Sequence, residues 1–393
     1  MMKSCVFAFA LMVIMLVTPC IAADIETGPV KEIYSGDLNQ NSHLYVKADG
    51  SNVLIGVINL KGTAPEDNRL VLYNLVSGET ETVATDIYPA TDLFDISGNN
   101  LLWYQGQGIM TLYDFKEKTK TNISLYRDFG RPSAIVLDSD RILTSEADLY
   151  SNHTDIFLLN ITTGEKNAIS KDPKSRIEPA ISGDIIIWRD RESDPFANVY
   201  GFDLNKNYEF AVHKEPFWQG MADISGDFVV WLRDESVSDA LQNTSKKIFL
   251  TNLSENTTIM IAESFDDLSS PKIEGDYVIW EDKKDGRWTL WLYEISTGNQ
   301  EKIANLKFGY DGPLNMEISG NNIFWTDQDD TGRAVIRTVA LQNEGNGNHE
   351  AEIPGNEKTS ATAKPVSKET GVGVIGIIGA LLAGICLYSN KKQ

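Results

Sequence analysis

The chain has 393 residues, of which 42% are hydrophobic, so it is long and apolar enough to bury a large core. Its 35 Lys and Arg stand against 56 Asp and Glu, which gives a formal net charge of -21 at pH 7. Such an acidic surface repels nucleic acid and anionic lipid headgroups, so the sequence excludes a nucleic-acid-binding protein. Cysteine occurs only at positions 5, 20 and 386, which excludes a disulfide-bonded domain between them.

Residues 1–23 are predicted to form a signal peptide. Lys3 precedes an apolar run from Val6 to Val17, and small residues end the segment. A basic start, an apolar centre and a small-residue end are typical of secretory signals. A retained N-terminal anchor is the alternative, and Cys20 also allows a lipoprotein. We therefore expect an exported domain over residues 24–341.

One phrase recurs through this domain: a glycine stands five residues before a tryptophan. Its clear copies are ISGNNLLWYQ (96–105), ISGDIIIWRD (181–190), ISGDFVVWLRD (224–234), IEGDYVIWED (273–282) and ISGNNIFWTD (318–327). Two degraded copies, at 46–58 and 135–146, have Gly50 and Ser139 in the glycine position. Successive glycine positions are 41 to 49 residues apart, a period typical of β-propeller blades.

Each copy predicts a tight turn followed by a strand that is apolar on both faces, as in Ile185–Trp188. An aromatic-rich strand, such as RLVLYNL (69–75) or TLWLYEI (289–295), a second turn and a short outer strand follow. The sequence therefore predicts an all-β protein, a seven-bladed β-propeller of four-stranded blades.

The last repeat lacks its outer strand, and residues 30–33 are predicted to supply it. Ile33 lies 17 residues before Gly50, just as Ile303 lies 17 residues before Gly320. The N-terminal strand would then close the ring and cover an exposed sheet edge.

A stalk and a membrane anchor are predicted after the propeller. Residues 342–370 are polar and rich in small residues, which is typical of a disordered segment. Residues 371–388 carry no charge and, as a helix, would be about 27 Å long, enough to cross a bilayer. The cytoplasmic tail, 389–393, contains Lys391 and Lys392, which the positive-inside rule places in the cytoplasm.

We therefore expect a single-pass protein of the cell membrane with an extracellular propeller. The predicted helix has a face of small residues that favours self-association, formed by Gly376, Ala380 and Gly384. Sequons that make candidate glycan acceptors in an exported domain begin at Asn122, Asn152, Asn160, Asn243, Asn252 and Asn256.

The repeated phrase resembles the TolB-like propeller repeats of archaeal cell-surface proteins, especially those of methanogens. The pattern P-x-I-S-G-D-x-x-x-W runs from Pro179 to Trp188 and, with Glu274 in place of serine, from Pro271 to Trp280. The resemblance covers about residues 30–341. It implies a WD40-like β-propeller in an archaeal envelope, where such repeats serve in surface-layer-associated and binding proteins of many kinds.

Catalytic motifs are scarce in the sequence. It contains no HExxH, GxSxG, Walker A or GxGxxG pattern, and its histidines, His43, His153, His213 and His349, are dispersed. Peptidases with propellers carry a separate hydrolase domain, for which no chain remains. We therefore expect a protein that is not an enzyme; a polysaccharide lyase or hydrolase with its site on the propeller is the alternative.

Acidic loops are the candidate cation sites, because hard cations prefer oxygen ligands. One group is formed by Asp327, Asp329 and Asp330, and the other by Asp282 and Asp285. No motif requires a cofactor, but these groups make Ca²⁺ a candidate. The alternative is that an Asp after the tryptophan strand only begins a turn.

The long loops fall on the rim opposite the glycine turns, and rigid scaffolds often carry binding residues on such loops. Phe217 and Trp218 stand between Pro216 and Gly220, while Arg189 and Arg233 closely follow a blade tryptophan. These four residues are the candidate ligand-binding residues. The alternative for the aromatic residues is packing under the neighbouring blade, and the alternative for the arginines is pairing with nearby Asp. We expect a surface-binding or envelope-structural module that contacts a protein or glycan, with a cation-dependent adhesion module as another possibility.

Overall fold

The structure is a computed structural model that describes residues 25–35, 42–59, 68–90, 93–125, 129–148, 153–169, 175–191, 196–235, 244–307 and 315–342. The predicted signal peptide, the stalk beyond Gln342, the membrane helix with Gly376, Ala380 and Gly384, and the cytoplasmic tail lie outside the described residues. Within the described ranges, no helix is long and apolar enough to cross a membrane.

The described residues form strands only, joined by turns. Two short strands come first, β1 (Glu26–Thr27) and β2 (Lys31–Ser35). Blade 1 consists of β3 (Ser42–Asp49), β4 (Asn52–Asn59), β5 (Arg69–Asn74) and β6 (Thr80–Thr85). Blade 2 consists of β7 (Phe94–Ser97), β8 (Asn100–Gly106), β9 (Ile109–Asp114) and β10 (Thr119–Ser124). Blade 3 consists of β11 (Phe129–Asp138), β12 (Arg141–Asp148), β13 (Thr154–Asn160) and β14 (Lys166–Ala168).

The second half repeats this arrangement. Blade 4 consists of β15 (Arg176–Ser182), β16 (Ile185–Asp190), β17 (Asn198–Asp203) and β18 (Tyr208–His213). Blade 5 consists of β19 (Trp218–Ser225), β20 (Phe228–Asp234), β21 (Lys246–Asn252) and β22 (Thr257–Ser264). Blade 6 consists of β23 (Asp267–Leu268), β24 (Lys272–Glu274), β25 (Tyr277–Lys284), β26 (Arg287–Glu294) and β27 (Gln300–Asn305). Blade 7 contains β28 (Met316–Ser319), β29 (Asn322–Gln328) and β30 (Ala334–Gln342).

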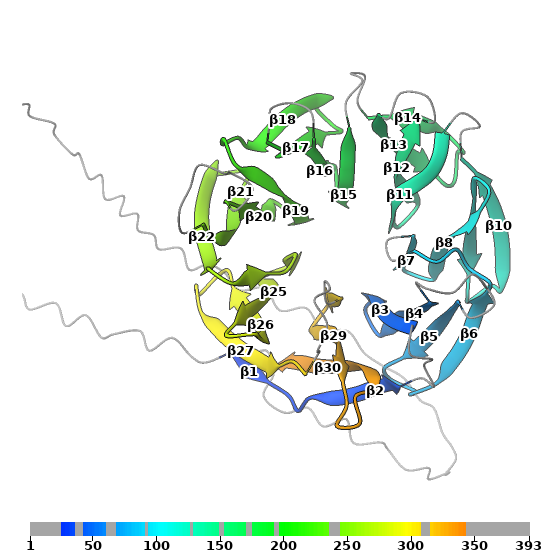
Figure 1. Ribbon diagram of the computed structural model, residues 1–393. Helices are drawn as coiled ribbons and strands as arrows, with labels where there is room; N and C mark the ends of the chain where they lie inside the picture. Colours follow the sequence, from blue (N-terminus) through cyan, green and yellow to red (C-terminus); the bar gives the residue numbers. More distant parts are fainter. Residues whose placement is uncertain are drawn as a thin grey trace, which may run out of the picture. The chain divides into compact units, whose positions relative to one another are not determined.

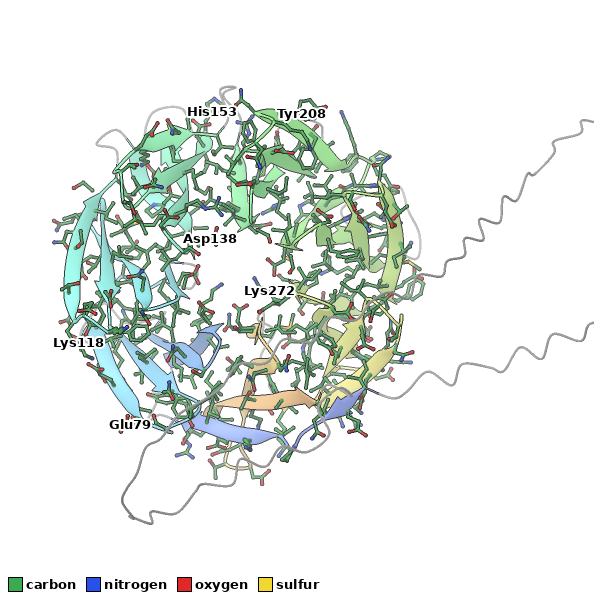
Figure 2. All side chains as sticks on the ribbon, turned by 180° about the vertical axis from the view of Figure 1, so that it is seen from behind. Glu79, Lys118, Asp138, His153, Tyr208 and Lys272 are labelled. Atoms are coloured by element: carbon green, nitrogen blue, oxygen red, sulfur yellow. The ribbon has the colours of Figure 1, made fainter. Side chains whose placement is uncertain are left out.

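The antiparallel sheets stand around a central axis as the blades of a propeller (Figure 1). In the described part of the chain there are seven of them, which confirms the predicted fold. The predicted closure is also confirmed: β2 pairs antiparallel with β30, with Lys31 opposite Thr338 and Tyr34 opposite Ile336. The first strand of each blade lies next to the axis, so Asp138 and Lys272 border it, while Glu79, Lys118 and Tyr208 lie at the circumference (Figure 2).

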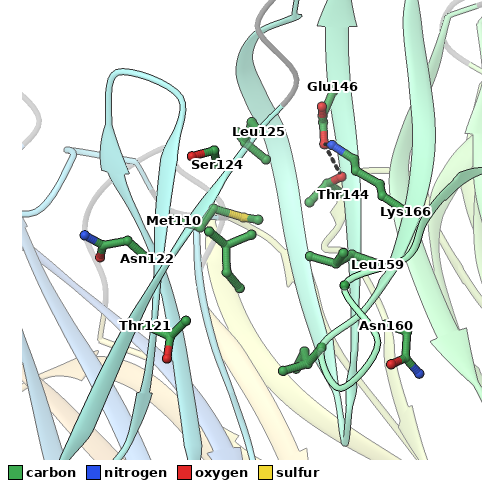
Figure 3. Close-up of a pocket in the computed structure, with 13 residues that line it drawn as sticks. Met110, Thr121, Asn122, Ser124, Leu125, Thr144, Glu146, Leu159, Asn160 and Lys166 are labelled. Atoms are coloured by element: carbon green, nitrogen blue, oxygen red, sulfur yellow. Dashed lines mark hydrogen bonds and ion pairs between the residues drawn. The ribbon is translucent and has the colours of Figure 1, made fainter.

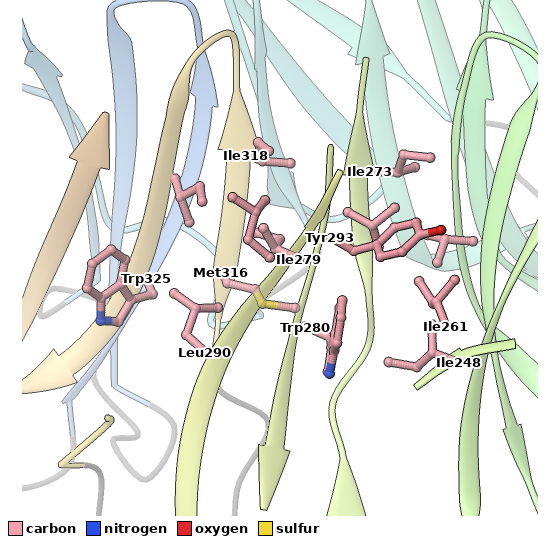
Figure 4. Packing of buried hydrophobic residues seen from close by; sticks show 14 of the residues in the cluster. Ile248, Ile261, Ile273, Ile279, Trp280, Leu290, Tyr293, Met316, Ile318 and Trp325 are labelled. Atoms are coloured by element: carbon pink, nitrogen blue, oxygen red, sulfur yellow. The ribbon is translucent and has the colours of Figure 1, made fainter. Parts of the chain in front are cut away.

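The repeated tryptophan fills the space between a blade and the blade before it. Trp103 shares a hydrophobic cluster with blade 1, Trp188 with blade 3 and Trp231 with blade 4. The largest cluster spans blades 5 to 7 and includes Trp280 and Trp325 (Figure 4). Because the second strand of each blade is sandwiched between neighbours, its sequence is apolar on both faces.

The residue before each repeated glycine joins neighbouring blades. The glycines take a φ near +56°, which favours glycine, and their N–H groups point to the preceding blade. These N–H groups donate to the side chains of Asp49, Ser182, Ser225, Glu274 and Ser319 at 2.5 to 2.9 Å. Ser97 accepts from Ser139, which replaces a glycine, at 3.0 Å. Each such bond contributes about 0.5–1.5 kcal/mol, so the Ser-Gly phrase serves blade assembly.

Candidate functional site

Two irregular inner strands, β15 and β19, build the candidate site. The pairing of β15 shifts register between Ile177 and Ala180, and that of β19 shifts between Gly220 and Asp223. At these bulges Glu178 and Met221 adopt φ values of +56° and +50°, which are unfavourable for side-chain-bearing residues. Strained backbone of this kind is concentrated at functional sites in proteins. This part of the wall around the axis is therefore the candidate functional site.

Glu178 connects the two bulges. One of its carboxylate oxygens accepts a hydrogen bond from Arg189 of the same blade, and the other accepts from the Met221 N–H of the next blade at 2.9 Å. The Glu178 side chain is 34% exposed and that of Arg189 is 14% exposed, so the ion pair lies at the surface edge of the interface. The Arg189 Nε is buried and has no hydrogen-bond partner among the described residues.

Trp218 supplies an aromatic face beside this ion pair. The guanidinium of Arg189 lies 5.0 Å from the centre of the Trp218 ring, a cation–π contact. Gly220 makes this approach possible, because a Cβ there would lie 2.4 Å from the Arg189 Cδ. Trp218 is partly exposed and Gly220 is buried. The site thus combines an aromatic platform, a cation and a carboxylate; we call Glu178, Arg189, Trp218, Gly220 and Met221 the bulge site.

A second stack of side chains lies beside the bulge site and includes Phe217, the residue before Trp218. The Arg233 guanidinium lies between the rings of Phe217 and Phe249, 4.9 and 4.8 Å from their centres. Phe249 in turn stacks on Trp231, with ring centres 4.7 Å apart. This row of planar groups belongs to the packing between blades and leaves the Arg233 side chain 13% exposed.

Acidic partners already neutralise Arg233. Glu215 and Glu235 both bond its guanidinium, and His213 Nε2 lies 3.0 Å from the Glu215 carboxylate. Burial acts to raise the pKa of Glu215, but its hydrogen bonds with His213 and Arg233 outweigh it and hold the pKa below its ordinary value. The pKa of Glu235 is lowered in the same way, with burial opposed by Lys247 and Arg233.

The structure therefore brings the four predicted ligand residues together as two pairs. Trp218 lies with Arg189 and Phe217 lies with Arg233. Both arginines form ion pairs, as the alternative interpretation stated, but with glutamates instead of Asp: Arg189 with Glu178, and Arg233 with Glu215 and Glu235. Their role in ligand binding stays a prediction. Glu178 and Met221 were not predicted from the sequence, because neither residue type marks a bulge.

The predicted cation ligands near the end of blade 7 are engaged in local bonds. Asp329 Oδ1 accepts from the Thr331 N–H at 2.8 Å and from the Arg333 N–H at 3.0 Å, which closes the turn. Bonds to Thr331 and Arg333 lower the pKa of Asp329 to about 2. Asp327 pairs with Arg337 at 3.0 Å, and Asp330 with Lys307 at 2.5 Å.

The other predicted pair lies in blade 6. Burial raises the pKa of Asp282, and Asp285 takes a φ of +52° in the turn that follows. Within the described residues, no three His, Cys, Asp or Glu side chains are arranged to hold a metal ion. Calcium binding at either group stays a prediction.

The sequons differ in their surroundings. Asn152 and Asn243 lie outside the described residues. Asn160 and Asn252 use their side-chain oxygen to accept N–H groups of the following turn, from Thr163 at 2.8 Å and from Ser254 at 3.0 Å. These two sequons are thus also part of a structural turn. Asn122 and Asn256 are exposed on the outer strand and outer turn of their blades.

Comparison with known proteins shows the fold. No protein-family model matches the sequence, and no curated protein matches it. A solved oligogalacturonate lyase in complex with manganese is 12% identical, with a TM-score of 0.63 over 81% of this chain and 96% of that chain. The β-propeller domain of the Trilobed protease from Pyrococcus furiosus, which has an open velcro topology, is 12% identical, with a TM-score of 0.55 over 78% of this chain and 100% of that domain.

A TolB-type protein from Agrobacterium tumefaciens is 16% identical over 70% of this chain and 98% of that chain, with a TM-score of 0.44. The two matches with a TM-score above 0.5 show that propellers are among the structural neighbours of this chain. The archaeal origin and the cell-surface location stay predictions.

These comparisons correct one prediction. We expected a protein that is not an enzyme, because propeller peptidases need a separate hydrolase domain. That expectation is wrong: the oligogalacturonate lyase is covered over 96% of its chain by this fold. A propeller of this size therefore suffices for an enzyme without a separate hydrolase domain. The manganese in that lyase is likewise compatible with the prediction that this propeller binds a metal ion.

Proposed function

We propose that the propeller binds a neutral carbohydrate at the bulge site. The observation that carries this proposal is the partly exposed Trp218 ring beside the Glu178–Arg189 ion pair. The C–H face of a sugar ring packs well on an aromatic face, and sugar hydroxyls both donate to carboxylates and accept from guanidinium groups. Glu178 and Arg189 offer both kinds of partner within one small surface.

Charge favours a neutral ligand over an acidic one. Arg189 is paired with Glu178, and Arg233 with Glu215 and Glu235, so neither arginine is left to neutralise an anionic sugar. The chain as a whole carries a net charge of -21, which repels anions at longer range. An uncharged polysaccharide or protein-linked glycan meets neither obstacle.

The expected location gives this binding a context. If residues 1–23 direct export and residues 371–388 anchor the chain, the bulge site would face envelope glycans outside the cell. Protease treatment of intact cells, followed by detection of the C-terminal fragment, tests this location. A propeller that stays intact on whole cells but is digested after lysis contradicts it.

The experiment for binding is a screen of the full chain against neutral and acidic glycans, with the Trp218→Ala variant in parallel. We expect neutral glycans to be retained and Trp218→Ala to weaken binding roughly 10-fold to 100-fold, because it removes the stacking face and the partner of Arg189. Tyr208→Ala is the matched control, since Tyr208 is an aromatic residue 61% exposed at the circumference.

Product analysis of each bound glycan belongs to the same experiment, because a propeller of this size can house a catalytic site. Equal binding by wild type and Trp218→Ala, or binding confined to acidic glycans, contradicts the proposal. Cleaved product from a bound glycan would make the bulge site a substrate-binding site of an enzyme.

A further inference from the structure

Blade 3 lacks the tryptophan that five of the other repeats carry, and a cavity lies in its place. Thr144 stands five residues after Ser139, the position that Trp103 and Trp188 hold in blades 2 and 4. Register agrees: Thr144 pairs with Phe157, just as Trp103 pairs with Thr111. Thr144 faces blade 2, because Ile142, two residues earlier on β12, packs in the cluster shared with that blade.

The cavity between blades 2 and 3 measures about 550 Å³ and is shown in Figure 3. Its walls are mostly apolar and come from Met110, Ile123, Leu125, Leu159 and Ile161, with Thr144, Glu146 and Lys166 at one end. A volume of this size lies within the range of about 300–1,000 Å³ that small-molecule sites occupy. Asn122 and Asn160, two of the sequon residues, also line it.

Blade 2 shows how this fold holds an indole at the equivalent place. The Trp103 Nε1–H donates to the Gln105 Oε1 at 2.9 Å. The Lys120 ammonium lies 5.4 Å from the centre of the Trp103 ring, over its face. The ring is therefore fixed by an acceptor two residues further along its own strand and by a cation from the outer strand.

Blade 3 keeps both of these partners without the tryptophan ring, and its lysine, Lys166, lies 4.7 Å from the centre of the Phe157 ring. Glu146 stands two residues after Thr144, in the place of Gln105. Lys166 on β14 pairs with Leu159, just as Lys120 on β10 pairs with Tyr113 two residues after Thr111, so the two lysines are equivalent. The acceptor and the cation that hold the indole in blade 2 thus both line an empty volume in blade 3.

The Glu146 carboxylate has an unused acceptor. Its Oε1 accepts from Thr144 Oγ1 and from Lys166 Nζ, each at 2.5 Å. Its Oε2 is buried and, among the described residues, has no hydrogen-bond partner. A buried carboxylate oxygen without a donor is unfavourable, so a ligand that brings a donor gains on binding.

We propose that this cavity binds a flat aromatic ligand with a ring N–H, an indole-type molecule, in the space that a tryptophan side chain fills in blade 2. The ring packs between the apolar walls of the two blades, its N–H donates to Glu146, and the Lys166 ammonium lies against its face. The charges of Glu146 and Lys166 cancel, so the ligand is neutral. This site is separate from the bulge site and does not depend on the proposed carbohydrate binding.

The test is a titration of the full chain with indole and with 1-methylindole, followed by ligand-observed NMR. The two probes have the same ring, but 1-methylindole has no N–H to donate. We expect saturable indole binding and a roughly 10-fold to 100-fold weaker affinity for 1-methylindole, the range for a hydrogen bond to a charged acceptor. No saturable binding of indole, or equal binding of the two probes, overturns the proposal.

A variant places the missing side chain back. Thr144→Trp is expected to abolish indole binding and to raise the melting temperature, because the new indole fills the cavity and reaches Glu146. Tyr208→Trp, which adds an indole at the exposed circumference and leaves the cavity open, is the matched control and should bind indole as the wild type does. Unchanged indole binding by a folded Thr144→Trp variant contradicts the assignment, and the comparison of the two probes on wild-type protein decides the matter if that variant does not fold.

The source of the indole is distinguished by a third probe. N-acetyltryptophanamide carries the same ring inside a short piece of polypeptide. If N-acetyltryptophanamide displaces indole, the cavity accepts a tryptophan side chain from a partner chain. If it does not displace indole, the ligand is a small molecule. Both results retain the indole site and identify which form of it the protein uses.

Discussion

Glu281 is the residue whose ionisation the fold changes most clearly. It lies on β25, directly after Trp280, and is fully buried. Burial raises its pKa from 4.5 to about 8; the Ser269 hydroxyl lowers the pKa and the Asp327 carboxylate adds to the rise. A carboxyl group with such a pKa is protonated at neutral pH, so the blade interior holds an acid in its neutral form.

The pKa of Glu281 predicts a pH-dependent stability. Because the pKa is higher in the folded chain than in the unfolded chain, the protonated group stabilises the fold fully below about pH 4.5. This contribution is lost as the pH rises towards 8, at roughly 1.4 kcal/mol for each pH unit in that window. Glu281→Gln removes the titration, so its melting temperature should rise relative to wild type between pH 5 and pH 8.

Melting curves of the two proteins across this pH range check the prediction. Glu79→Gln serves as the control, since Glu79 is an exposed residue of an outer turn. A constant difference between wild type and Glu281→Gln from pH 5 to pH 8 would show that Glu281 does not titrate in this window.

At the scale of a single turn, the serine of the repeated phrase joins two blades. Ser225 of blade 5 accepts the Gly275 N–H of blade 6 at 2.9 Å. Ser225→Ala should lower the free energy of unfolding by about 1 kcal/mol, because the Gly275 N–H loses its partner. Ser225→Thr keeps the hydroxyl and should retain most of the stability. Chemical denaturation measures both, and equal losses in the two variants would assign the effect to strand packing instead of the hydrogen bond.

The closing strand, β2, completes the seventh blade. Without β2, the outer side of β30 has no partner over residues 335–338, and the seventh blade is left one strand short. Tyr34→Pro interrupts the pairing at its centre, since proline cannot donate to a ladder and strains the strand. We expect the variant to melt several degrees lower and to aggregate more readily through the exposed edge. An unchanged melting temperature and a monomeric variant would contradict this.

Elements were predictable from the sequence where a repeat marks them. The glycine–tryptophan spacing located five blades, the degraded copies at 46–58 and 135–146 located the other two, and the orphan segment at residues 30–33 located the closing strand at Lys31–Ser35. The bulges were not predictable, because glutamate and methionine rarely take the positive φ that Glu178 and Met221 adopt. Two acidic partners of the arginines were not identified for a similar reason: Glu178 and Glu215 lie 11 and 18 residues away in the sequence and reach the arginines only after folding.

The cavity between blades 2 and 3 was only partly predictable from the sequence. The degraded repeat at residues 135–146 was visible in the sequence, and its Thr144 is the sign that a large side chain is missing. The equivalence of Lys166 with Lys120 could not be read there, because it follows from the register of β13 with β14 and of β9 with β10. A repeat that departs from its siblings is therefore a useful indication of a site, and the register of the strands shows which residues surround it.

At the scale of the whole molecule, the net negative charge destabilises the closed ring of blades. The chain carries a charge of -21, and the bonds between blades are individually weak. Acidic groups crowd the axis: burial raises the pKa of Glu274, and the carboxylates of Glu317, Asp49 and Asp223 add to the rise. Mutual repulsion of this kind destabilises the compact state, and salt screens it within a Debye length of about 10 Å at 0.1 M.

Salt should therefore stabilise this propeller. Surface ion pairs such as Lys118 with Glu81 weaken as salt is added, but each contributes only about 0–1 kcal/mol, so the relief of long-range repulsion dominates. We expect the melting temperature to rise from about 10 mM to about 150 mM NaCl, where the Debye length falls from about 30 to about 8 Å. A flat or falling melting temperature would mean that the ion pairs outweigh the repulsion. The same series at equal ionic strength in CaCl₂ separates screening from binding. Screening alone gives the same melting temperatures in both salts. A further rise in the melting temperature that is specific to Ca²⁺ indicates a cation held by acidic groups such as Asp329 and Asp330.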